Sequence, residues 1–337
     1  MMDKEQNNVL LEVEDLHVSF ATPVGQVNAV NGISYTLHRH EVMGIVGESG
    51  SGKTVEALTI MGLLGTNATV DSGSIRFDGQ ELLEKSEKDY VTFRGKEVGM
   101  IFQNPMTSLN PVYTIGRQLT EALTVHDKGI TKKQAQARAI EMLTHVGITQ
   151  PEKRMKQYPF ELSGGMRQRV MIAMGIICHP KLLIADEPTT ALDVTIQAQI
   201  LDLIKKVQQE TGMAVIFITH NLGVVADICD SVTVMYAGHI VEQGSARDIF
   251  YHTKHPYTQG LLRSTPSIDP DNNERLIPIP GEPVNLLALP DGCPFARRCT
   301  QCMEKCLAEK PPKTEFSPGH IAYCWLYGEG KEDGTHG

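Results

Sequence analysis

The chain has 337 residues, of which 41% are hydrophobic and 21% are charged, and this length predicts about two domains with a sizeable core. Its 31 basic and 40 acidic side chains give a formal net charge of −9. An acidic chain without a long run of Lys or Arg argues against extended binding to the phosphate backbone of DNA or RNA, so we expect no nucleic-acid partner.

Two features of the sequence bear on location. The N-terminal residues lack the apolar core of a secretory signal, and the longest apolar stretch, residues 170–178, is interrupted by Gly175. This stretch is far shorter than the roughly 20 residues that a membrane-spanning helix needs. We therefore expect an intracellular protein that is soluble by itself and reaches a membrane only through partner proteins.

The N-terminal part of the chain has the patterns of β-strands. Residues 9–20 and 26–37 alternate between apolar and polar side chains and are separated by turn-forming residues, as in paired strands. Residues 74–77, followed by Asp78-Gly79, add a further hairpin signal.

The rest of the chain alternates between helical and strand patterns. Apolar side chains recur at helical spacings in residues 115–146, which predicts an inserted helical region. Residues 182–185, 214–218 and 232–236 are short apolar runs separated by helix-like segments, which is typical of a mostly parallel sheet buried on both faces.

Residues 47–54 read Gly-Glu-Ser-Gly-Ser-Gly-Lys-Thr, a complete G-x-x-x-x-G-K-[ST] loop between an apolar run and a helix-like segment. Its glycines allow backbone N–H groups to surround phosphate oxygens, Lys53 can reach the β- and γ-phosphates, and Thr54 can hold Mg²⁺. The alternative is a glycine-rich strand-to-helix turn with a chance lysine. The residues predicted to bind a nucleoside triphosphate here are Gly47, Glu48, Ser49, Gly50, Ser51, Gly52, Lys53 and Thr54.

Two carboxylates follow the apolar run at 182–185, at the carboxyl end of a predicted strand, where open α/β sheets bind ligands. Asp186 can support Mg²⁺, and Glu187 can orient or polarise an attacking water molecule. Such a strand end can also be a plain surface turn, but the intact phosphate loop favours a metal and water site.

Ser163 precedes two glycines and an apolar helix in the sequence Leu-Ser-Gly-Gly-Met at 162–166. The simplest interpretation is a helix N-cap. Because exposed N–H groups at a glycine-flanked helix start bind anions, a γ-phosphate could also dock there.

With the loop at 47–54, LSGGM at 162–166 and LLIADEP at 182–188, the chain resembles the nucleotide-binding subunit of an ABC transporter. The resemblance implies an α/β fold, a P-loop NTPase of ABC type with an N-terminal antiparallel β subdomain, an inserted helical subdomain and a small irregular C-terminal extension. The implied domains are residues 1–245, with the helical subdomain at about 104–162, and the extension at 246–337.

The resemblance also assigns four residues that carry little weight alone, since an isolated polar side chain at a strand end or in a loop is usually only hydrogen-bonded. Gln103 matches the Q-loop, Asp193 matches the D-loop of Ala191-Leu192-Asp193, and His220 matches the switch histidine, a catalytic residue together with Glu187. Phe20 matches an aromatic that stacks on adenine. Mg²⁺ would be held by Thr54, Gln103 and Asp186.

In this family two ATPase subunits pair head to tail, and each ATP lies between the phosphate loop of one subunit and the SGG segment of the other. Ser163, Gly164, Gly165 and Asp193 would therefore face the partner's nucleotide.

Further short segments of the sequence resemble those of the ATPases of oligopeptide and dipeptide importers, and the resemblance extends over nearly the whole chain. These segments are NPMTSLNP at 104–111, HPYT at 255–258, IPGEP at 279–283 and GCPFARRC at 292–299. The physical pattern of HPYT alone predicts only a proline-directed turn. The resemblance implies an ATPase at the cytoplasmic face of the cell membrane that powers peptide import. Its implied partners are a second, homologous ATPase in a heterodimer, two transmembrane permease subunits and, through the complex, an extracellular peptide-binding protein.

Other functions stay open at this point. Importers of nickel, glutathione or another small solute are the nearest alternatives. A soluble ABC ATPase of translation would carry two ATPase modules in one chain, whereas this chain has a single set of motifs. A DNA-repair ATPase would need a long coiled coil between Thr54 and Ser163, where only about 108 residues lie.

Five of the seven cysteines are clustered in the tail: Cys293, Cys299, Cys302, Cys306 and Cys324. In an intracellular chain this clustering favours a metal or iron-sulfur site over disulfides, and four thiolates would complete tetrahedral zinc or a four-iron cluster. The resemblance implies a [4Fe-4S] cluster on the cysteines at 293, 299, 306 and 324. Cys302 is an additional, possible substitute ligand, and zinc or no metal are the alternatives.

Overall fold

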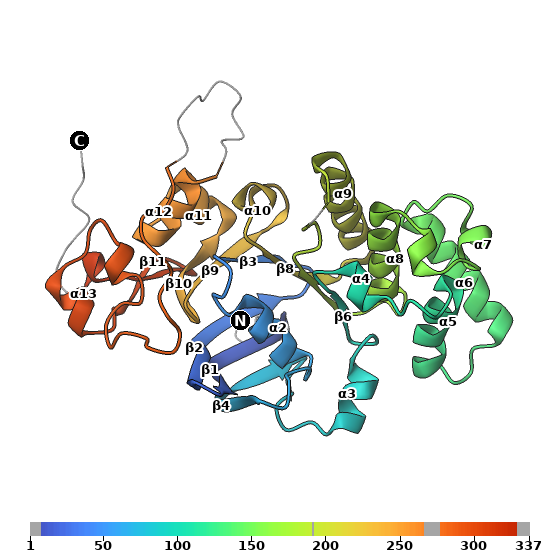
Figure 1. Ribbon diagram of the computed structural model, residues 1–337, viewed down its shortest axis with the longest axis horizontal. Coiled ribbons are helices and arrows are strands. Elements are labelled where there is room, and N and C mark those ends of the chain that lie inside the picture. Colours follow the sequence, from blue (N-terminus) through green and yellow to red (C-terminus); the bar gives the residue numbers. More distant parts are fainter. Residues whose placement is uncertain (1–7, 191, 266–276, 329–337) are drawn as a thin grey trace. The chain divides into compact units, whose positions relative to one another are not determined.

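The computed structural model describes residues 8–190, 192–265 and 277–328 (Figure 1). The chain divides into two compact units. The first unit contains His38–Glu41 and Glu84–Ile218. The second contains Val9–Leu37, Val42–Leu83 and the chain from Thr219 onward. The predicted domain boundary at residue 245 falls inside the second unit. The division into two units therefore does not test this boundary, which stays a prediction.

The first unit is built on three parallel strands, β6 (Val98–Ile101), β7 (Leu182–Asp186) and β8 (Ala214–Thr219), with β7 between the other two. Every residue of these strands is buried, which explains why they read as continuous apolar runs. The parallel sheet predicted for this part of the chain is confirmed.

Helices make up most of the first unit, and the inserted helical region is confirmed there. The helices are α3 (Glu87–Phe93), α4 (Pro105–Ser108), α5 (Ile115–His126), α6 (Lys132–His145), α7 (Pro151–Arg154), α8 (Gly164–Ile176) and α9 (Val194–Thr211), with a 3₁₀ turn η1 (Pro159–Glu161). The predicted helical stretch at 115–146 is broken between α5 and α6. Thr131 ends this break, because its side chain and that of Gln134 form a capping box that starts α6.

The N-terminal strands of the second unit form the predicted antiparallel sheet, and their order in it is β2-β1-β4-β5. These strands are β1 (Val9–Thr22), β2 (Gly25–His38), β4 (Ala68–Phe77) and β5 (Gln80–Glu81). Asp78 and Gly79, which join β4 to β5, have φ values of 50° and 76°, and this left-handed backbone is what a tight hairpin turn needs.

A mixed sheet completes the second unit. β3 (Val42–Val46) pairs in parallel with β9 (Ser231–Tyr236), which pairs antiparallel with β10 (His239–Ser245). The tail adds the hairpin of β11 (Lys313–Ser317) and β12 (His320–Tyr323), and β12 pairs antiparallel with β10.

The second unit also contains short helices: α2 (Lys53–Ile60), α10 (Leu222–Ile228), α11 (Ala246–Tyr251), α12 (Pro256–Arg263), α13 (Glu304–Ala308), and the 3₁₀ turns η2 (Ala296–Arg298) and η3 (Trp325–Tyr327). Within the described ranges, none of the helices combines the length and the apolar character needed to span a bilayer.

Candidate nucleotide site

The phosphate loop lies in the second unit, between the buried strand β3 and helix α2. Gly52 has a φ of 100°, and a Cβ atom there would lie 2.5 Å from the carbonyl oxygen of Ala29. A Cβ at Gly47 would lie 2.2 Å from the carbonyl oxygen of Met235. Both positions therefore require glycine, because the neighbouring atoms belong to the backbone.

Lys53 is the charged side chain of this loop. It is 5% exposed, and its Nζ donates hydrogen bonds to the carbonyl oxygens of Gly47 (2.7 Å) and Glu48 (2.9 Å). The loop's own backbone thus folds around the ammonium group and holds it at the start of α2. Ser51 is also buried, whereas Ser49, Gly50 and Thr54 are exposed.

Glu48 is engaged by the C-terminal part of the chain. Its backbone N–H donates to Tyr257 Oη (2.9 Å), and its carboxylate accepts two hydrogen bonds from Arg298, from Nη1 at 2.5 Å and from Nη2 at 3.0 Å. The hydrogen bonds to Glu48 raise the pKa of Arg298 above its ordinary value despite partial desolvation. The tail is therefore in direct contact with the phosphate loop.

The acidic strand end lies in the first unit. Asp186, the last residue of β7, is 3% exposed. Glu187 follows with a φ of 45°, an unusual conformation for a residue other than glycine and one that occurs often at functional sites. Its N–H donates to the carbonyl oxygen of Ile218 (2.9 Å) in β8, which fixes this conformation beside the sheet.

The carboxylate of Glu187 accepts hydrogen bonds from two side chains. Gln103 donates through Nε2 at 2.9 Å, and Thr190 donates through Oγ1 at 2.8 Å. The structure thus brings together Gln103 and Glu187, two of the predicted site residues, and the second hydrogen bond orients the carboxylate further.

Ser163 and Asp193 each cap a helix of the first unit. Ser163 Oγ accepts from the N–H of Met166 (3.4 Å) at the start of α8, so the N-cap interpretation is confirmed. Asp193 Oδ1 accepts from the N–H of Ile196 (3.0 Å) at the start of α9. A Cβ at Gly165 would lie 3.0 Å from the side chain of Ile196, so the two helix starts are neighbours. Ala191, the first residue of the predicted D-loop, lies outside the described residues.

The remaining predicted residues lie in the second unit. Phe20 is half-buried near the end of β1, opposite Ala68 of β4. His220 is exposed directly after β8, and the next residue, Asn221, caps α10 by accepting from the N–H of Gly223 (3.0 Å). The predicted ATP-site residues are therefore divided between the two units.

Comparison with known proteins identifies the family of the chain. The family model described as "ABC transporter" matches residues 30–190, and the model described as "Oligopeptide/dipeptide transporter, C-terminal region" matches residues 241–306. An oligopeptide transport ATP-binding protein, OppD, of Salmonella typhimurium is 55% identical over 94% of this chain and 94% of its own. A dipeptide transport ATP-binding protein, DppD, of Bacillus subtilis is 52% identical over the same shares.

The chain belongs to the family of ABC-type oligopeptide and dipeptide transport ATP-binding proteins. Solved structures agree with the ABC fold. The cbiO1 subunit of Clostridium perfringens, part of the ABC transporter complex cbiONQ, has a TM-score of 0.61 and 29% identity, and the match covers 72% of this chain and 91% of that one. The ATP-binding cassette MJ0796 bound to ADP and Pi has a TM-score of 0.64 and 23% identity, over 71% and 99%. The predicted fold class and the family resemblance are both confirmed.

Several residues of this ABC protein were missed by the sequence motifs. Gln168, which follows LSGGM, is buried and donates through Nε2 to the carbonyl oxygen of Pro188 (2.6 Å), joining α8 to the acidic strand end. Tyr257 belongs to HPYT, which is not just a turn: His255 caps α12 and Pro256 occupies its first position. Gln168 could have been predicted from its fixed position two residues after the LSGGM motif. No local sequence pattern indicates a role for Tyr257.

Four of the tail cysteines of the ABC protein, Cys293, Cys299, Cys306 and Cys324, line one small cavity of about 10 Å³. Cys302 is exposed and does not line it. Burial raises the pKa of Cys293 to about 11 and that of Cys324 to about 12, so both thiols are protonated at neutral pH.

The donor chemistry of this cavity fits zinc or an iron-sulfur cluster, but its geometry does not. In the part of the chain that the structure describes, no group of three or more His, Cys, Asp or Glu side chains is placed to hold a metal ion. The cavity has room for about one water molecule, which is too little for a four-iron cluster unless side chains move. The arrangement therefore does not support the predicted cluster.

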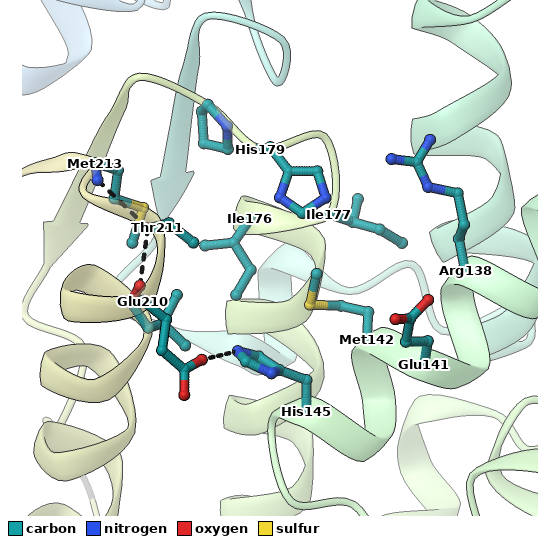
Figure 2. Close-up of a pocket in the computed structure, with 12 residues that line it drawn as sticks. Arg138, Glu141, Met142, His145, Ile176, Ile177, His179, Glu210, Thr211 and Met213 are labelled. Atoms are coloured by element: carbon teal, nitrogen blue, oxygen red, sulfur yellow. Dashed lines mark hydrogen bonds and ion pairs between the residues drawn. The ribbon is translucent and has the colours of Figure 1, made fainter.

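A larger cavity of about 600 Å³ lies in the first unit among α6, α9 and the segment after α8 (Figure 2). Met142, Ile176 and Ile177 are among the residues that line it, as are His145 and Glu210, which form an ion pair between Nε2 and Oε2 (3.3 Å). None of the residues predicted for the nucleotide site lines it.

Proposed function

We propose that this chain binds and hydrolyses ATP and thereby powers the import of oligopeptides or dipeptides through a membrane permease. The observation that carries the proposal is the phosphate loop, in which two positions require glycine and Lys53 is enclosed by the loop backbone. The chain that contains this loop belongs to a family of peptide-transport ATP-binding proteins. An N–H-rich loop at a helix start with a buried lysine suits a triphosphate.

Each of the predicted site residues has its own role in phosphoryl transfer. Lys53 neutralises charge on the β- and γ-phosphates, and Thr54, Gln103 and Asp186 supply the oxygen ligands that Mg²⁺ prefers. Bound Mg²⁺ supplies further charge neutralisation. Glu187 orients the attacking water, and the hydrogen bond from Gln103 holds its carboxylate in place.

The remaining predicted residues complete the proposed site. His220 is the switch histidine, a catalytic residue beside the γ-phosphate, and Phe20 stacks on the adenine. Ser163 and the two following glycines, with Asp193, serve the nucleotide of a partner ATPase. The support for this arrangement is the family assignment and the adjacency of the α8 and α9 helix starts.

The variant Glu187→Gln tests the hydrolytic role. The amide keeps the size of the side chain and can still accept from Gln103, so ATP binding should be retained, while loss of the carboxylate should lower turnover by about 10²–10⁴-fold. Lys53→Ala should weaken both binding and turnover. Normal turnover by Glu187→Gln would contradict the role of Glu187.

The solute is assigned from the relatives, whose names specify oligopeptide and dipeptide transport. Uptake of labelled di-, tri- and pentapeptides should stop in a strain that lacks this chain and return when it is supplied, but not when Glu187→Gln is supplied. Continued peptide uptake together with lost uptake of nickel or glutathione would reassign the solute.

The partners are proposed from the family and from exposed apolar side chains. Residues Phe102, Met106 and Val112 are 36%, 57% and 70% exposed, and they lie in and beside the segment 104–113 where a permease helix would dock. Val194, next to Asp193, is 83% exposed and suits contact with a second, homologous ATPase. A heterodimer on two permease subunits, supplied by an extracellular binding protein, would place the chain at the cytoplasmic face of the membrane. Met106→Asp should abolish peptide uptake while leaving ATP binding intact.

The tail metal centre is a separate part of the proposal. A [4Fe-4S] cluster on Cys293, Cys299, Cys306 and Cys324 would require these side chains to move apart and lose their protons. Iron and acid-labile sulfide that co-purify with the anaerobically isolated chain would establish the cluster. Zinc without sulfide, or no metal, would reject the cluster.

A further inference from the structure

The contact between the tail and the phosphate loop is local and specific. Arg298 forms a bidentate pair with the carboxylate of Glu48, the second residue of the loop, and Tyr257 Oη accepts from the N–H of the same residue. Side chain and backbone of Glu48 are thus both held by residues that lie more than 200 positions later in the chain.

Arg298 is itself held in one position. Its side chain is 6% exposed, its Nε donates to the carbonyl oxygen of Pro280 (3.0 Å), and Nη1 also lies 3.4 Å from Tyr236 Oη. A planar guanidinium with these partners has little freedom, and a carboxylate that meets it in fork geometry is oriented in turn.

Tyr257 is equally constrained. It is fully buried, and its ring packs against Tyr236 and Phe295 with centroid distances of 4.7 Å and 5.2 Å. Burial raises the pKa of Tyr257, and its neutral hydroxyl accepts from the N–H of Glu48 at 2.9 Å.

We infer that Arg298 and Tyr257 are positioning residues for ATP binding, which act through Glu48 to hold the phosphate loop in its binding conformation. Glu48 then serves the loop as its anchor, while the following N–H groups and Lys53 contact the phosphates. This inference rests on the proposed function, since it concerns the affinity of the same loop for ATP.

Arg298 lies next to residues that line the small cysteine cavity of the tail. Arg298 ends the short turn η2, in which its N–H donates to the carbonyl oxygen of Phe295 (2.9 Å), and Cys299 follows directly. Cys293, Phe295 and Cys299 all line the small cysteine cavity. One short piece of backbone therefore sets both the packing of that cavity and the place of Arg298 beside the loop.

Arg298→Ala in the full-length chain tests the inference by titration with ATP and with a fluorescent ATP analogue. Without its anchor the loop samples other conformations, so the Kd for ATP should rise at least tenfold, which corresponds to about 1.4 kcal/mol. Arg297→Ala is the matched control, because Arg297 is the exposed neighbour of Arg298, and its Kd should stay within twofold of the parent.

Two milder variants control for a general loss of folding. Arg298→Lys keeps the charge but loses the bidentate geometry, and Tyr257→Phe removes only the acceptor oxygen. Each should raise the Kd about threefold while its Tm stays within about 3 °C of the parent. In the Glu48→Gln background, Arg298→Ala should add less than a twofold further change in Kd, because Arg298 acts through Glu48.

Steady-state kinetics separates positioning from a merely structural role. KM for ATP should rise with the Kd, whereas kcat at saturating ATP should stay within twofold, since the residues proposed to activate water are unchanged. An unchanged KM with a reduced kcat, or an effect of Arg298→Ala that persists in the Glu48→Gln background, would overturn the inference. If the parent chain does not bind ATP at all, the proposed function fails; if the parent and Arg298→Ala bind equally well, only this inference fails.

Discussion

Removal of the carboxylate of Glu242 should release the tail from the rest of the second unit. Glu242 lies in β10 with no exposed surface, and it accepts hydrogen bonds from Thr253 Oγ1 (3.0 Å), Lys254 N (2.6 Å) and His255 N (3.0 Å). His320 Nε2 in β12 pairs with the same carboxylate at 3.1 Å. One buried acidic group thus joins β10 to the start of α12 and to the C-terminal hairpin.

The magnitude follows from this geometry. Glu242→Ala would leave a buried histidine and two backbone N–H groups without their acceptor. Each buried polar group that loses its partner costs about 1–3 kcal/mol, so we expect a total of at least about 3 kcal/mol. A domain of 150–250 residues loses roughly 2–4 °C of Tm per kcal/mol, so we expect a fall of roughly 10 °C.

Differential scanning calorimetry and limited proteolysis of the full-length chain measure this effect. Cleavage should begin in the tail, at bonds between α12 and β12. Glu242→Gln retains one acceptor oxygen and should lose less, and Glu304→Ala, at an exposed carboxylate of the same tail, should change Tm by less than 2 °C. If Glu242→Ala melts within 2 °C of the parent, the carboxylate does not anchor the tail.

Three further outcomes can be measured. Desolvation acts to raise the pKa of Glu242, but the hydrogen bonds from its histidine partner and from backbone N–H groups together outweigh it, so the pKa lies below its ordinary value. Its contribution to the unfolding free energy is therefore present above the ordinary Glu pKa of about 4.3 and is lost as the pH falls through the lowered value, so denaturation midpoints should drop in this acid range less steeply for Glu242→Gln. Gly52→Ala should raise the Kd for ATP at least tenfold in titration, because its Cβ would meet the carbonyl oxygen of Ala29 and its φ of 100° is strained for alanine. Gln168→Ala should lower the unfolding free energy by about 1–3 kcal/mol, measured by chemical denaturation, since the buried carbonyl oxygen of Pro188 loses its donor; a stability equal to that of the parent would show that this bond is not needed.

The fold and the phosphate loop could be predicted because their signals are local. Residues 47–54 form a loop whose glycines, lysine and threonine each have a separate physical reason, and the buried strands appear as apolar runs of the right length. The N-cap role of Ser163 was equally readable, because a cap involves only the next three residues.

The contacts that hold the site in place could not be predicted. Glu48 and Arg298 are 250 positions apart, and no periodicity connects a loop glutamate with an arginine in a tail turn. The hydrogen bond of Gln103 to Glu187 likewise depends on how the parallel strands β6 and β7 are aligned. Pairings of this kind are set by the fold and appear in the sequence only as unremarkable polar residues.

The pairing of β12 with β10 has a consequence for any shorter version of this protein. β10 ends at Ser245, near the predicted end of the ATPase domain, and Glu242 and Gln243 are opposite Ala322 and Ile321 of the tail. A chain cut after residue 245 would expose unpaired N–H and C=O groups along an edge strand whose residues are mostly buried in the full chain. Such an edge is a template for adding a strand from another molecule, so the trimmed ATPase domain should self-associate even if its nucleotide residues are intact.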